Sequence, residues 1–264
     1  MLLLLCVIVA GLVVSVGWGF SAIALIERLR GPLARYLTLG EIGLVGLAAQ
    51  GVIGMALNAA LPLSPAITGV AALLGAAAFA SRIGPVWRAH VDRGGSILMP
   101  VVLALGAGLA VSRYGYWSAA YHFDTGLYHV QAIRQLMDFP MLLGAANIHM
   151  RFGYNSSWAF VAAMQSMGVT ELAGVFAVNA VLLLLVLWSL AWRCGDGLRT
   201  GKLSAVFALL VILLLLTPAI DARGQVGNPN TDLPTILLVL VAFQLARKIQ
   251  HALPVEGLAP LAAA

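Results

Sequence analysis

Long apolar runs constrain this sequence more than any other feature. Seven of them can be drawn, at residues 2–26, 37–63, 66–81, 97–112, 172–192, 203–220 and 233–246. A helix needs about 20 apolar residues to cross the hydrocarbon core of a bilayer. Only 9% of the 264 residues are charged, against roughly 25% in an ordinary soluble domain. The sequence therefore predicts an all-α integral membrane protein with about seven transmembrane helices.

The positions of the basic residues predict how the chain is oriented in the membrane. Eleven of the 15 Lys and Arg residues fall at 28–35, 82–93, 193–202 and 247–248. Loops rich in Lys and Arg stay on the cytoplasmic side of a membrane. The polar loops 113–171 and 219–232 are then extracytoplasmic. The net charge of +5 is explained by these cytoplasmic positions, so we expect no nucleic-acid partner.

The runs divide the chain into two segments. Residues 1–96 are expected to hold the first three helices and their cytoplasmic loops. Residues 97–264 form the core that carries both extracytoplasmic loops. Within it, residues 156–168 are too short and too polar to span the membrane, so we expect an interfacial or partly dipped helix there.

The first polar loop opens with an expected helix over residues 121–137. Asp124 and Tyr128 are four residues apart and share a face of that helix. His122 and His129, seven apart, also lie along one side. Apolar residues on the other side suit a helix that lies along the membrane surface. The pattern predicts an amphipathic extracytoplasmic helix that places an acid near the lipid headgroups.

Polar side chains continue after this helix. Asn147, His149 and Arg151 alternate with apolar residues, so an extended chain would point all three the same way. An arginine can bind two phosphate oxygens at once, and a histidine can donate another hydrogen bond. Asn155 follows as a further candidate. We expect these residues to bind an anionic substrate.

The second polar loop is shorter. Its candidate residues, acids, amides and an arginine, fall between residues 221 and 232: Asp221, Arg223, Asn228, Asn230 and Asp232. Glycines and Pro229 indicate a turn in this stretch. Asp232 stands where a helix would begin.

Simpler roles remain open for several of these residues. Asp124 could cap its own helix or pair with Arg134, and Asp232 could serve only as a helix cap. Arg151 could neutralise a lipid headgroup. The spacing of His, Asp and Glu matches no compact metal motif, so we predict no metal site. The scattered acids still permit a divalent cation, and the cofactor is left unknown.

Three stretches, FDTGLYHVQAIRQL, NIHMRFGYNSSW and NPNTDLP, resemble a family of bacterial integral membrane proteins. That family is similar in turn to the GT-C glycosyltransferases, which use sugars carried on polyprenyl phosphate. The resemblance implies that Asp124 is the catalytic carboxylate of the first extracytoplasmic loop. Asp221 or Asp232 would then be a second catalytic group.

The same resemblance implies a substrate and a place in the cell. The protein would transfer a sugar from a lipid-phosphate donor during cell-envelope glycan synthesis, on the outer face of the bacterial inner membrane. GT-C enzymes generally have more spanning helices, which leaves open a truncated relative or a partner membrane subunit. The alternatives are a transporter or flippase of lipid-linked sugars and a non-catalytic membrane assembly subunit.

Overall fold

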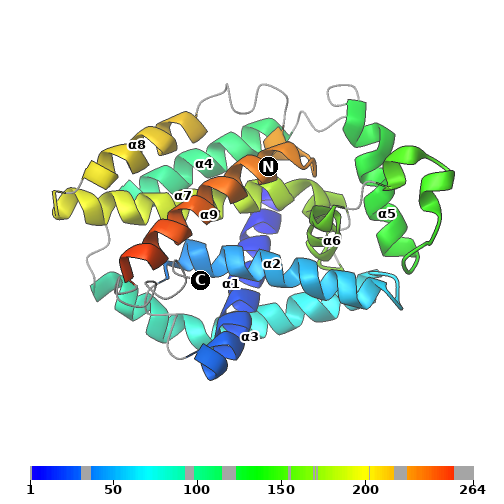
Figure 1. Cartoon of the computed structure of the whole chain (residues 1–264), viewed down its shortest axis with the longest axis horizontal. Coiled ribbons are helices and arrows are strands. Elements are labelled where there is room, and N and C mark those ends of the chain that lie inside the picture. Colours follow the sequence, from blue (N-terminus) through cyan, green and yellow to red (C-terminus); the bar gives the residue numbers. More distant parts are fainter. Residues whose placement is uncertain are drawn as a thin grey trace, which may run out of the picture.

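The computed structural model describes residues 2–30, 37–92, 98–114, 123–153, 156–168, 170, 172–201, 203–216 and 225–252 (Figure 1). Within these ranges every regular element is helical and no strand occurs. The all-α class predicted from the apolar runs is therefore confirmed for the described part of the chain.

The helices follow the apolar runs closely. In chain order they are α1 (Leu2–Arg30), α2 (Leu39–Asn58), α3 (Pro65–Asp92), α4 (Leu98–Tyr114), α5 (Val130–Asp138), α6 (Ser157–Met164), α7 (Leu172–Arg199), α8 (Leu203–Leu215) and α9 (Asp232–Ala252). Shorter turns lie between them: the π-helical turn η2 (Thr125–His129) and the 3-10 turns η3 (Ala145–Asn147), η4 (Met150–Gly153) and η5 (Gln225–Gly227).

Four of these helices, α1, α2, α3 and α7, are long and apolar enough to cross a membrane. Their apolar stretches run from 20 to 28 residues, which matches the thickness of the bilayer core. The protein is therefore an integral membrane protein. Shorter apolar stretches occur in α4, α8 and α9, at Met99–Ala110, Ala205–Leu215 and Asp232–Gln244.

Helix α7 lies at the centre of the molecule. It packs against α1 and α2 on one side and against α4 and α8 on the other (Figure 1). Leu182, Leu183 and Leu185 on this helix are fully buried. A helix that is apolar on all sides belongs in the interior, and the leucine-rich sequence of α7 has that character.

Helices α1 and α2 cross at very close range. A Cβ atom added to Gly46 would lie 1.7 Å from the backbone oxygen of Ser15, and one added to Gly19 would lie 1.9 Å from that of Ile42. Such approach requires glycine on both helices. Small residues at helix crossings are typical of membrane proteins, where van der Waals packing drives association.

A polar contact marks one end of this bundle. Thr38 and Glu41 form a reciprocal capping box at the start of α2. The buried Glu41 carboxylate also accepts a hydrogen bond from Arg193, near the end of α7. These contacts join the start of α2 to the last turns of α7.

Helix α5 lies at the opposite end of α2 and runs across it rather than along it (Figure 1). Asn58, the last residue of α2, holds it there. The Nδ2 atom of Asn58 donates to the backbone oxygens of Leu136 and Phe139, each at 3.0 Å. The backbone oxygen of Asn58 accepts from the amide of Met141 at 2.8 Å. Ile133 provides the buried apolar contact of α5.

The segment 156–168 forms the short helix α6, as expected from its length. Its position is interior, because Phe160, Val161 and Met164 are buried. Gln165, just after the helix, donates to Ser15 Oγ at 3.1 Å and to Gln50 Oε1 at 2.9 Å. These bonds hold the end of α6 between α1 and α2.

Candidate functional site

Asp124 stands at the start of the helical segment that leads into α5. Its carboxylate accepts a hydrogen bond from Arg151 Nη1 at 2.5 Å, and it makes no side-chain cap to the helix that follows. The alternatives of a plain cap and of pairing with Arg134 do not describe this geometry. Asp124 is instead joined to a residue of η4, beyond the end of α5.

The helix adopts a π-helical turn over Thr125–His129, directly after Asp124. Such turns are rare and occur frequently at functional sites. Tyr128 lies in this turn, with its ring centroid 4.9 Å from the Arg151 guanidinium carbon. The His129 ring lies 4.2 Å from the Tyr128 ring. Asp124 and Tyr128 thus face the same guanidinium, in keeping with the predicted shared face.

The expectation of an extended chain over residues 147–151 is wrong. Two 3-10 turns, η3 and η4, take up most of this segment. The strand alternation that would align Asn147 with Arg151 is therefore absent. His149 packs its ring 5.6 Å from that of Phe152, and its Nδ1 accepts from the Arg151 amide at 3.3 Å. Local turn geometry replaced the alternation because Gly144, in a left-handed conformation, starts the first turn.

In the described part of the second loop, 225–231, residues 226–230 are buried rather than open to solvent. Asn228 and Asn230 are each 1% exposed. Asn179, a fully buried residue of α7, donates to the Gln225 oxygen at 2.9 Å and to Asn230 Oδ1 at 3.0 Å. Asn230 is thereby committed to this network. A buried backbone segment needs such partners for its polar groups.

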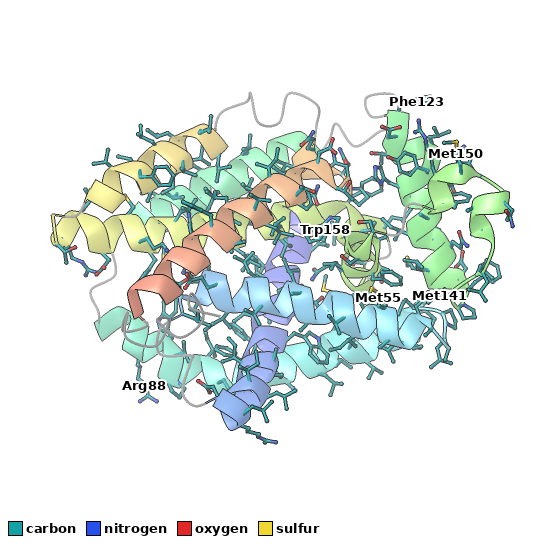
Figure 2. All side chains as sticks on the ribbon, in the orientation of Figure 1. Met55, Arg88, Phe123, Met141, Met150 and Trp158 are labelled. Atoms are coloured by element: carbon teal, nitrogen blue, oxygen red, sulfur yellow. The ribbon has the colours of Figure 1, made fainter. Side chains whose placement is uncertain are left out.

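Asn179 also contacts α6. Its Oδ1 accepts from the indole Nε1 of Trp158 at 2.9 Å. Figure 2 labels Trp158. One amide therefore connects α6, α7 and the second loop. Sequence reasoning missed this residue, although a signal was present: Asn179 is the only polar side chain in the run from residue 172 to residue 188.

A cavity of about 90 Å³ lies between the two loops. Its walls come from η2 and α5, from η4, from the start of α6 and from the second loop: Tyr128, His129, Ala132, Ile133, Arg151, Ser156, Ala159, Pro229 and Thr231. Residues separated by about a hundred positions thus surround one space. The cavity is lined by the Arg151 guanidinium, by two aromatic rings and by hydroxyl groups, a set suited to an anionic ligand.

The other predicted site residues either do not line this cavity or lie outside the described residues. Asp232 begins α9 with an exposed side chain, next to the cavity-lining Thr231. Asn147 and His149 do not line the cavity. The remaining candidates, His122, Asn155, Asp221 and Arg223, lie outside the described residues.

One protein family matches almost the whole chain. A model of the family described as domain of unknown function DUF8201 matches residues 1–257. This chain belongs to the DUF8201 family. No curated protein and no solved structure matches it. The function of this DUF8201 protein is therefore argued from its site.

The residues that the structure describes form no cluster of metal ligands. No group of three or more His, Cys, Asp or Glu side chains is close enough there to hold an ion. The charges at the centre of this DUF8201 site are instead one carboxylate and one guanidinium, Asp124 and Arg151.

Proposed function

We propose that this protein is a GT-C-like membrane glycosyltransferase that takes a sugar from a lipid-phosphate donor. The observation that carries the proposal is the cavity between the loops, with Arg151 in its wall and Asp124 bonded to Arg151. Sugar transfer from a lipid phosphate needs a cation for the phosphate and a base for the acceptor. Both groups are adjacent here.

The site lies on the extracytoplasmic side in this proposal. Arg193 and Glu41 meet at one end of the bundle, whereas α5 and the cavity lie at the other end of α2. Arg193 and Arg199 of α7 lie at the Glu41 end, and segments rich in Lys and Arg stay in the cytoplasm. Helices α4, α8 and α9 complete the seven spans, and the inner bacterial membrane is the expected location.

Transfer would proceed by displacement at the anomeric carbon. The acceptor hydroxyl oxygen forms a bond to that carbon while the bond from the carbon to the phosphate oxygen breaks. Asp124 takes the hydroxyl proton as general base. The lipid phosphate leaves with the bonding electron pair, and Arg151 stabilises its charge. Attack opposite the leaving group inverts the anomeric centre.

In this proposal, donor binding also changes the ion pair between Asp124 and Arg151. In the structure one oxygen of the Asp124 carboxylate accepts a hydrogen bond from Arg151. A bound phosphate competes for the same guanidinium. Donor binding therefore draws Arg151 away from Asp124 and leaves the carboxylate available to the acceptor.

The proposal is tested by a transfer assay on the full chain in lipid nanodiscs, with a radiolabelled polyprenyl-phosphate sugar. Asp124→Asn should reduce the rate by roughly 10²–10⁴-fold, the usual contribution of a general base. Asp196→Asn is the matched control, because Asp196 is an exposed acid at the opposite end of α7 that pairs with Arg199. Full activity in Asp124→Asn would refute the assigned base.

A further inference from the structure

A second hollow adjoins the cavity between the loops. It is a groove of about 280 Å³ bounded by α5, the 141–146 segment, η4 and α6. Ala132, Ser156 and Ala159 line both the cavity and the groove. The two spaces are therefore neighbouring compartments of one site.

The two compartments differ in chemistry. The cavity is lined by Arg151, His129 and Thr231 among others. The groove wall is apolar or glycine except for Gln135 and Ser156. A polar space with a cation, next to an apolar space, fits a ligand with an anionic head and a hydrocarbon tail.

We propose that the groove holds the hydrocarbon chain of a lipid phosphate whose head lies in the cavity. This inference rests on the proposed function and adds the compartment that selects the lipid. Charge complementarity assigns the ends, because Arg151 lies at the head end. The tail end is assigned by the groove wall, which includes Met141, Leu142 and the strongly exposed Leu143.

Exposed apolar residues lie near one end of the groove. The Met141 amide is bonded to the Asn58 oxygen at the end of α2. Met55 and Leu61, on either side of Asn58, are exposed apolar residues, and Figure 2 places Met55 and Met141 at this end of the molecule. A hydrocarbon chain leaving the groove here would meet these exposed apolar side chains.

The size of the groove limits how much of the chain it contacts. Cavity and groove together reach only the lower end of the range for small-molecule sites, roughly 300–1,000 Å³. The groove therefore holds the isoprene units nearest the phosphate. Small residues, among them Ala145 and Gly153, line the groove.

Photolabelling tests this arrangement without requiring catalysis. The probe is a long-chain polyprenyl phosphate with a diazirine on the isoprene unit nearest the phosphate, added to the full chain in nanodiscs. Label should appear in the peptide that covers residues 139–153. Ala145→Phe should reduce that label at least about fivefold, because overfilling a packed site weakens binding. The control Ala56→Phe adds the same bulk to an exposed position of α2 and should leave the label unchanged.

Competition separates the possible results. Unlabelled polyprenyl phosphate should remove the label, whereas equal concentrations of inorganic phosphate or of polyprenol should not. Removal by inorganic phosphate would make this a free-phosphate site and overturn the tail compartment. Ala146→Trp, at an exposed groove position, repeats the test if Ala145→Phe does not fold.

The failure of this inference can be told apart from failure of the proposed function. Saturable binding that Arg151→Gln weakens, with label only on the exposed faces of α3, α8 or α9, would overturn the groove and leave the donor site standing. A lack of saturable binding to the unaltered chain would overturn both.

Discussion

Asp124 and Arg151 form an ion pair between residues 27 positions apart, with side chains 44% and 34% exposed. Exposed pairs of this kind contribute about 0–1 kcal/mol to stability, because water screens the charges. Their proximity is therefore of more consequence for ligand binding than for folding. The sequence supplied both residues as candidates, but their contact depends on the turns η3 and η4.

The first prediction concerns the stability of variants at this pair. Asp124→Asn and Arg151→Gln should each lower the free energy of unfolding by less than about 1 kcal/mol. Denaturant titration followed by tryptophan fluorescence would measure the change. A much larger loss in either variant would mean that the pair supports the fold, and activity losses could not then be assigned to chemistry.

Asn179 has the opposite character, because it is fully buried and hydrogen-bonded to both α6 and the second loop. Its removal would leave buried polar groups without partners, at a cost of about 1–3 kcal/mol for each group. The second loop would lose its attachment to α7 as well.

Asn179→Leu should therefore lower the thermal midpoint and increase amide exchange over residues 225–231. Hydrogen exchange with mass spectrometry measures the second effect at peptide level. Ser21→Ala is a suitable control, since the Ser21 hydroxyl donates to the backbone oxygen of Gly17, one turn earlier on the same helix. Unchanged exchange in the second loop of Asn179→Leu would show that other contacts hold it.

At the scale of elements, the membrane makes helices predictable from sequence. Backbone groups in a bilayer must bond within their own segment, so a long apolar run becomes a helix. The runs near α1, α2 and α7 illustrate this agreement. The 147–151 segment shows the limit, because alternation alone does not distinguish a strand from a series of turns.

The close crossing of α1 and α2 yields an element-scale prediction. Gly46→Ala places a methyl group where the Ser15 oxygen already lies, so the helices must separate. We expect the free energy of unfolding to fall by about 1–3 kcal/mol or more, the usual cost of overpacking. Gly108→Ala on α4 meets no atom within 4 Å and should be neutral or slightly stabilising.

Thermal denaturation in detergent, compared between the two glycine variants, would check this prediction. Equal midpoints for Gly46→Ala and Gly108→Ala would mean that the α1–α2 crossing is not as tight as the structure shows.

For the whole molecule, the orientation deduced from the basic loops is open to direct measurement. In a chain with Cys6 and Cys194 changed to serine, Leu143→Cys and Leu198→Cys place thiols at exposed positions near opposite ends. A membrane-impermeant maleimide should label Leu143→Cys in intact cells and Leu198→Cys only after permeabilisation. The reverse pattern would place the candidate site in the cytoplasm.

The sequence by itself determined that this is a helical membrane protein, because so few charged residues leave lipid as the solvent for most of its surface. It also indicated the polar segments that supply the site. Only the tertiary structure decided that Arg151 meets Asp124, that Asn179 holds the second loop and that an apolar groove adjoins the cavity. Those contacts join residues distant in the chain. They depend on how the helices pack together, which no local sequence pattern predicts.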